Sequence, residues 1–333
     1  MLRFLANNIE QVDLALEHVA KGDANNARFG LMLLDNVVEI TLHQIAKDKQ
    51  NDLSSFLHRD KPYAHAAALK AALGQHFDSK VKFAKKIGKL SEETGNSIGI
   101  FHSFRNEVYH IGVQHEAILP AIVPFYFQLS CELLDGYKPP FFGYSHGMTL
   151  PERSRKYFGT DRFFSRGIED YHGACKTLGD SIPFQPAEMA GALADHMDGV
   201  IKQQDIAIEV IATGGPRQYT RDEAIVETFA WRIAFSDEGK KYAQANRFRG
   251  SLSEFITWLG DNYPFPFRSD PIPGWRTRAA RVRAETNPHK ALKKYRDFVT
   301  QTEESREALD QAHGQVDQYI EEQIERMRED RRR

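Results

Sequence analysis

Apolar residues recur at helical spacing along almost the whole chain, and this periodicity restricts the fold more than any other feature. Residues 3–20 carry an apolar side chain every three or four positions, and residues 25–47 repeat the pattern through Leu31, Leu34 and Val38. Such spacing places the apolar side chains on one face of an α-helix, whereas the alternation typical of strands is scarce. We therefore predict an all-α protein.

Turn signals divide this pattern into separate helices in the first half of the chain. Lys21-Gly22-Asp23 predicts the end of one helix and the cap of the next. Residues 63–90 indicate two shorter helices around Gly74, and residues 116–135 indicate an apolar helix that completes a bundle.

A cluster of paired prolines and glycines at residues 136–143 cannot continue a helix. We therefore place a domain junction near residue 145, with a helical bundle over residues 1–145 and a second, mostly α-helical domain over residues 146–333. Further helical patterns lie at about 151–178, 187–213, 220–235 and 251–260.

The composition excludes several classes of protein. The chain has 333 residues, of which 41% are hydrophobic and 27% charged, as in ordinary soluble globular proteins. A formal net charge of -2 argues against a uniformly basic surface, so any nucleic-acid contact must use local patches. The longest apolar run, residues 117–134, is interrupted by Pro120 and Pro124, and residues 1–8 lack a signal-peptide core. We expect a cytoplasmic protein that does not contact a membrane.

Cysteine and histidine spacing gives no indication of a metal or another cofactor. Cys131 and Cys175 are far apart in the sequence, with no Cys-x-x-Cys pair, and are expected to be buried free thiols. His102, His110 and His115 fall on different helical faces, so a metal site built from them is not expected. A Gly-rich phosphate loop and a Gly-x-Ser-x-Gly motif are both missing from the sequence.

One short segment, residues 104–110, combines side chains that bind phosphate and transfer protons. On a helix, Asn106 and His110 are one turn apart, so the amide can hydrogen-bond to the imidazole and orient it. Arg105 supplies a planar fork of donors that matches phosphate oxygens. The opposite face is predicted to enter the core through Ile100, Phe101, Phe104, Val108 and Ile111.

An arginine separated from a histidine by four to six residues is weak evidence for a catalytic site, because this spacing occurs five times in the chain. The other four pairs are Arg59/His65, Arg166/His172, Arg283/His289 and Arg306/His313. Among the five arginines, only Arg105 is followed by asparagine. By itself the spacing favours a half-buried helix with ordinary surface contacts.

Residues 1–145 resemble the HEPN family of compact helical domains. The resemblance rests on the helix Asn26-Ala27-Arg28-Phe29-Gly30-Leu31-Met32-Leu33-Leu34-Asp35-Asn36-Val37-Val38-Glu39, on a helical hairpin, and on Arg105-Asn106-x-x-x-His110. It implies a ribonuclease motif in which Arg105, Asn106 and His110 act together and two copies meet across a homodimer. A toxin or antiphage-defence role, with an antitoxin or defence-system partner, is implied as well. Some toxins of the family carry a tyrosine where this chain has Gly112, so regulation through that tyrosine is not expected.

The chemistry of these residues also fits RNA cleavage. RNA supplies its own nucleophile in the 2′-hydroxyl, which histidine can activate, and arginine can stabilise the charged phosphorane. A two-fold dimer would supply both an acid and a base, giving a 2′,3′-cyclic phosphate and a 5′-hydroxyl. We predict a metal-independent endoribonuclease with Arg105, Asn106 and His110 in its site. The alternative is a non-catalytic helical module that binds RNA, a nucleotide or a protein partner.

Two acidic residues could support the site. Asp35 and Glu39 share one face of the helix predicted over residues 25–47. They are either solvent-facing or structural, or one of them approaches the Arg-His site and tunes it.

Basic residues concentrate near the C-terminus, between Trp275 and the positions around Tyr295. The cluster comprises Arg276, Arg278, Arg281, Arg283, Lys290, Lys293, Lys294 and Arg296. It fits either an RNA groove, in which the two aromatic rings stack on bases, or a solvated helix face. Beyond it, residues 302–333 carry a helical stripe of apolar residues that packs either on a partner or on its own domain: Leu309, Val316, Ile320, Ile324 and Met327.

Overall fold

The computed structural model describes residues 1–55, 62–110, 116–143, 149–158, 167–265 and 267–332. Within these ranges every regular element is helical, so the predicted all-α class is confirmed. The chain divides into two compact units, one formed by residues 1–193 and 285–293 and the other by residues 194–284 and 294–333.

In the described residues the first unit contains eight elements and a further short one, η2, together with the beginnings of two long helices. The eight are α1 (Leu2–Val19), α2 (Ala24–Ser54), α3 (Ala66–Ala72), α4 (Phe77–Lys86), α5 (Glu92–His110), η1 (Glu116–Ile118), α6 (Leu119–Gly136) and α7 (Ile168–Gly179), with the short η2 (Arg153–Lys156) before α7. The two long helices are α8 (Pro186–Thr213) and α13 (Pro288–Arg332), and both continue into the second unit.

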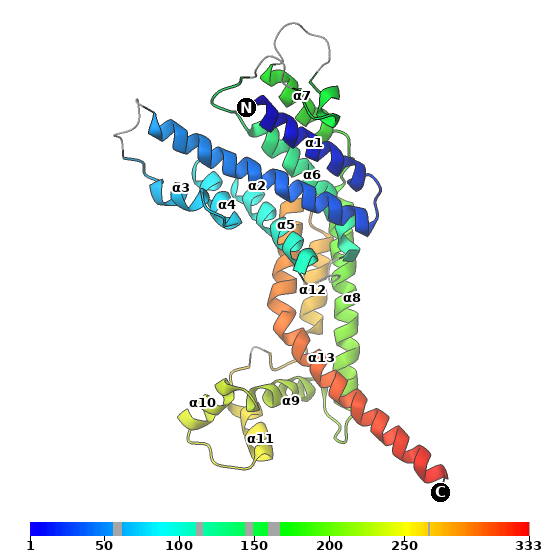
Figure 1. Cartoon of the computed structure of the whole chain (residues 1–333). Coiled ribbons are helices and arrows are strands. Elements are labelled where there is room, and N and C mark those ends of the chain that lie inside the picture. The colour runs from blue at the N-terminus through cyan, green and yellow to red at the C-terminus, as the bar shows by residue number, and fades with distance from the viewer. Residues whose placement is uncertain (56–61, 111–115, 144–148, 159–166, 266, 333) are drawn as a thin grey trace. The chain divides into compact units, whose positions relative to one another are not determined.

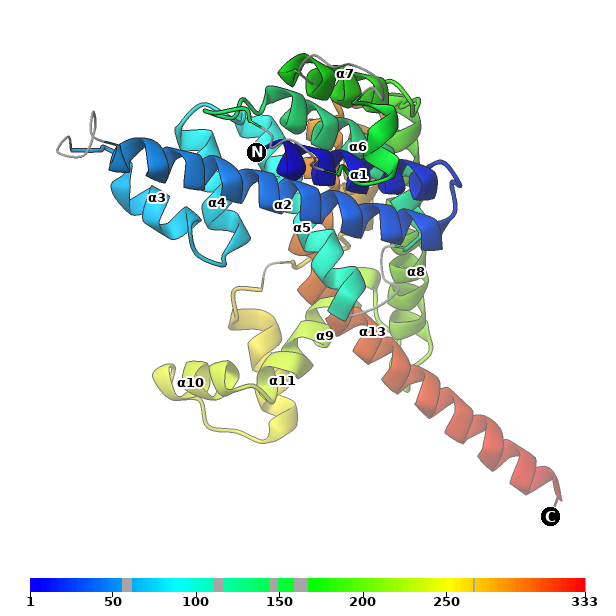
Figure 2. The ribbon, with the colours of Figure 1, turned by 45° about the horizontal axis from the view of Figure 1, so that its top comes forward.

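Helix α2 is the centre of the first unit, where it packs against α1, α4, α5 and α6 (Figures 1 and 2). Close approach is possible at Gly30, because a Cβ atom there would lie 2.6 Å from Val19 Cγ2 and 3.5 Å from Val123 Cγ1. The turn into α2 follows the sequence prediction. Gly22 takes a left-handed φ of 71°, and the Asp23 side chain accepts a hydrogen bond from the Asn26 backbone N–H at 3.0 Å.

Helix α6 supplies the most apolar part of this core. Together with η1 it is the one described segment long and apolar enough to cross a membrane, but 67% of its apolar window is buried inside the fold. Its Cys131 lies in this buried surface, and Cys175 of α7 is buried as well. Both cysteines are free, which confirms the sequence prediction.

The first unit continues past the junction predicted near residue 145, because η2 and α7 pack on α1 and α6. Buried Asp13 of α1 accepts hydrogen bonds from Arg153 at 3.0 Å and Tyr157 at 2.6 Å, and pairs with Lys156 at 2.6 Å. Burial alone would raise the pKa of Asp13, but the hydrogen bonds from Lys156, Tyr157 and Arg153 outweigh it and hold the pKa below 3.8. A buried carboxylate thus anchors the segment that the sequence assigned to a second domain.

The second unit is formed by the remaining parts of α8 and α13 with α9 (Arg221–Ala234), α10 (Asp237–Ala245), α11 (Leu252–Asn262) and α12 (Ile272–Arg283). Helices α9 and α11 begin with capping boxes, at Thr220/Glu223 and Ser251/Glu254, where the sequence predicts helix starts. Helix α10 begins at a serine cap and was not predicted.

Candidate functional site

Helix α5 presents two different faces, as the sequence predicts for residues 104–110. Phe101, Phe104 and Val108 are buried in the core, Ile100 is half-buried, and Ile111 lies outside the described residues. The opposite face carries His102, Arg105 and Asn106 at positions one turn apart or adjacent. Helix α2 faces this side of α5 and contributes a carboxylate to it.

That carboxylate belongs to Asp35, whose side chain is only 2% exposed. Its oxygens accept hydrogen bonds from the Tyr126 hydroxyl at 3.1 Å and face the His102 Nδ1 atom at 3.0 and 3.2 Å. The Arg105 Nε atom lies 3.7 Å from the same carboxylate. Burying an acidic group is costly unless donors compensate, and these three side chains supply them.

The contact with Asp35 fixes the chemical state of the His102 ring. Because a carboxylate only accepts hydrogen bonds, the Nδ1 atom must carry the proton, and Nε2 is left to exchange a proton with a ligand. The ring is 18% exposed and stacks on Phe77 with centroids 3.7 Å apart. Burial and the neighbouring Asp35 raise the pKa of Tyr126, so its hydroxyl remains a donor. His102 is therefore held in one orientation by contacts on two sides.

Arg105 combines an internal contact with exposure to solvent. Its Nη1 atom donates to Asn106 Oδ1 at 2.9 Å, and its side chain is 38% exposed. Asn106 therefore orients the guanidinium group, while the contact predicted between Asn106 and His110 lies outside the described residues. A guanidinium group held by an amide and a carboxylate, yet open to solvent, can bind a phosphate with little further ordering.

Two further residues were predicted at this site, His110 and Glu39. The backbone of α5 extends to His110, one turn beyond Asn106, but the His110 side chain lies outside the described residues. Glu39 is directed to Lys80, which pairs with it at 3.1 Å. The structure thus brings together Asp35, Arg105 and Asn106, and leaves Glu39 in a separate ion pair.

His102 was not predicted as a partner of Arg105. His102 was considered only as a metal ligand, although it is three residues before Arg105 and four before Asn106 and so shares their helical face. The signal that was available was this spacing, combined with a carboxylate on the facing helix predicted over residues 25–47.

Three arginines of the basic cluster contact other side chains of the second unit. Arg276 bonds to Asp205 at 2.7 Å, and Arg283 bonds to Asp195 and Asp198 at 2.7 and 2.8 Å. Arg278 lies over the Phe298 ring at 5.2 Å, and burial lowers its pKa. Arg281, Lys293 and Lys294 are exposed.

Trp275 and Tyr295, predicted as possible stacking residues in an RNA groove, are both buried. Tyr295 instead contacts His196 Nδ1 at 3.1 Å through its hydroxyl, and Trp275 packs edge-on against Phe298. Neither ring is available to a nucleic-acid base, so the stacking expectation is wrong.

Comparisons with known proteins identify no relative of this chain. Family models, curated proteins and solved structures yield no match to this chain. Among the residues that the structure describes, no group of three or more histidine, cysteine, aspartate or glutamate side chains is placed to hold a metal ion.

Proposed function

We propose that this chain is a metal-independent endoribonuclease whose site lies on the α5 face that contains His102, Arg105 and Asn106. The observation that carries the proposal is the contact of buried Asp35 with both His102 and Arg105, at 3.0 and 3.7 Å. It combines a proton-transfer group of fixed orientation with a solvent-exposed cation, which is what cleavage of a phosphodiester by its own 2′-hydroxyl requires.

Each residue then has a defined role. Arg105 binds the scissile phosphate and stabilises the charge that develops on the phosphorane. His102, held by Asp35, takes the 2′-hydroxyl proton at Nε2, and Asn106 keeps the guanidinium group in position. His110 donates the proton to the leaving 5′-oxygen. The bond from phosphorus to the 5′-oxygen breaks as the bond to the 2′-oxygen forms, which leaves a 2′,3′-cyclic phosphate.

These roles also change what the expected homodimer must contribute to the site. His102 and His110 are each four residues from Asn106, and eight residues turn the helix by only roughly 80° beyond two full turns, so both residues can serve one site, contrary to the expectation that they fall on different faces. A homodimer that juxtaposes two such helices would complete the site with a second arginine, whereas acid and base can both come from one chain.

The proposal is tested by incubating a mixed pool of end-labelled RNA with the protein in EDTA and identifying the product ends. Wild type is compared with Arg105→Ala, His102→Ala and His110→Ala. The matched control is His172→Ala, because His172 also contacts an aspartate, Asp135, at 2.8 Å but lies on α7. Circular dichroism establishes that each variant is folded.

Cyclic phosphates from wild type and the control, with a loss of about 10²-fold or more in the site variants, support the proposal. Equal cleavage by wild type and all three site variants contradicts it. RNA binding that depends on Arg105 without any cleavage favours instead the non-catalytic binding module.

A further inference from the structure

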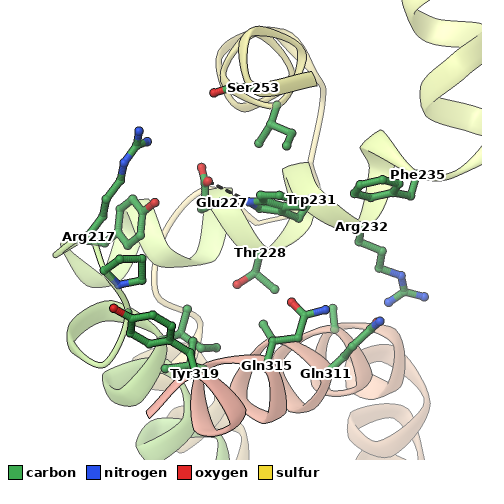
Figure 3. A pocket seen from close by; sticks show the side chains of 18 of the residues that line it. Arg217, Glu227, Thr228, Trp231, Arg232, Phe235, Ser253, Gln311, Gln315 and Tyr319 are labelled. Atoms are coloured by element: carbon green, nitrogen blue, oxygen red, sulfur yellow. Dashed lines mark hydrogen bonds between the residues drawn. The ribbon is translucent and has the colours of Figure 1, made fainter. Parts of the chain in front are cut away.

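The second unit contains a large cavity that is unrelated to the α5 site. Its volume is ≈ 1590 Å³, and it is lined by α9, α11, α13 and the loop after α8. Figure 3 shows Gln315 pointing from α13 toward Thr228 of α9, with Tyr319 and Gln311 on either side of it. The middle of α13 therefore forms one wall, and α9 forms the facing wall.

The rim of this cavity exposes large apolar side chains. Trp231, Phe235 and Leu252 are 45%, 61% and 49% exposed, although side chains of this size are usually buried. The Trp231 and Phe235 rings stack with centroids 5.8 Å apart, one turn from each other on α9. An exposed apolar patch beside a cavity is typical of a surface that binds a partner.

The size of the cavity favours a helix over a small molecule. Small-molecule sites measure about 300–1,000 Å³. A helix about 10 Å across that rises about 1.5 Å per residue fills roughly 120 Å³ per residue. The cavity therefore matches a helical segment of on the order of a dozen residues.

The same chain carries a helix of that length and character. Beyond Ile320, α13 continues to Arg332 with side chains that are almost all exposed where the structure describes them, and in Figure 1 this end extends past α9 and α11. Ile324 and Met327 are exposed and continue the stripe of Val316 and Ile320. A helix with one unpartnered apolar stripe is suited to lie in an apolar groove.

We propose that the cavity receives the C-terminal end of α13 from a second copy of the chain, antiparallel to the receiving α13. With a two-fold axis near Ile320, residues 321–332 of one copy lie along residues 308–319 of the other. The cavity wall on α13 runs from Ala308 to Tyr319, so the two segments have the same length. In this register Ile324 faces Val316, and Met327 lies beside Ala312.

The charges of the two segments fit an antiparallel arrangement. Residues 303–310 contain four acidic residues and one arginine, whereas residues 326–333 contain five arginines and two acidic residues. The antiparallel register directs the basic end of one copy toward the acidic stretch of the other. By symmetry each contact forms twice, once in each cavity.

The test uses three full-length proteins, measured by sedimentation equilibrium and native mass spectrometry at tens of micromolar. The end variant carries Ile324→Glu and Met327→Glu, and the cavity variant carries Trp231→Ser and Phe235→Ser. All four side chains are exposed, so the substitutions should leave the fold intact. Phe141→Ser, which removes an exposed ring from the first unit, is the matched control.

Wild type and the control are expected to dimerise, and each double variant should raise the dimer Kd by about 30-fold or more. Mixing the end variant with the cavity variant restores one of the two contacts, since the first retains a cavity and the second retains an end. This mixture should form more heterodimer than two mass-tagged copies of the end variant.

A monomeric wild type overturns the proposal, and so do equal dimer levels in every mixture. The homodimer expected for RNA cleavage would form equally in all mixtures, because none of these substitutions touches α5. Failure of this proposal and failure of the ribonuclease proposal are therefore distinguishable.

Discussion

Replacing Asp35 with asparagine removes the negative charge of this buried side chain and leaves its size almost unchanged. The amide retains one oxygen, which can still accept a hydrogen bond from the Tyr126 hydroxyl. In the wild type this hydroxyl lies 3.1 Å from Asp35 Oδ1. It loses the charge-assisted contact with His102, worth about 1.5–3 kcal/mol, and the 3.7 Å pairing with the exposed Arg105, worth about 0.5 kcal/mol or less. We expect a loss of about 2 kcal/mol in the free energy of unfolding.

Asp35→Ala should cost more than Asp35→Asn. It leaves the fully buried Tyr126 hydroxyl without its acceptor, which adds about 1–3 kcal/mol, and it opens a small cavity. Asp135→Asn is the matched control, because Asp135 also faces a histidine at 2.8 Å but is exposed. Its loss should not exceed about 0.5 kcal/mol.

Urea unfolding followed by circular dichroism measures all three values, and nitrogen NMR measures the tautomer of His102. In Asp35→Asn the amide N–H₂ can turn toward the ring, so Nδ1 becomes an acceptor and the proton moves to Nε2. RNA cleavage should then fall by about 10²-fold or more. Equal losses of stability in Asp35→Asn and Asp135→Asn, or a His102 that keeps its proton on Nδ1, would refute this role of Asp35.

Three further predictions concern packing and pH. Asp13→Asn should cost about 2 kcal/mol at neutral pH. Because the folded-state pKa of Asp13 is lowered, this stability is present above about pH 4 and is lost as the pH falls through that pKa, so the urea curves of variant and wild type should converge as the pH is lowered. Gly30→Ala should lower the free energy of unfolding by about 1–3 kcal/mol through overpacking, whereas Gly173→Ala, on an open face of α7, should raise it by about 0.5–1 kcal/mol in the same urea assay. Burial raises the pKa of the Cys175 thiol to about 12 and raises that of Cys131 as well, so both should react with a thiol reagent at mildly alkaline pH only after unfolding.

The helices could be predicted because their signals are local. Apolar spacing, the Gly22 turn and the paired-proline segment at residues 136–143 all act within a few residues of the structure that they specify. The domain junction could not be located in the same way. Anchoring of η2 depends on Asp13, a buried carboxylate about 140 residues earlier in the chain, and nothing near residue 145 records that contact.

The candidate site was partly predictable for the same reason. Arg105 and Asn106 are adjacent on one helix, so the sequence places them together without any knowledge of the fold. The contact between Asp35 and His102 joins residues 67 positions apart, and its existence depends on how α2 and α5 pack. Helical spacing could indicate that His102 shares the face of Arg105, but not which carboxylate would face it.

The arginines of α5 and α12 both contact aspartates, yet burial gives these contacts different consequences. Asp195 and Asp198 are exposed, so their bonds to Arg283 add little stability, and a phosphate could replace them. Asp35 is buried and cannot exchange its donors for water without a large loss of stability. Salt should therefore weaken any RNA contact made by α12 while leaving the contact between His102 and Asp35 intact, because that contact is largely buried and little screened.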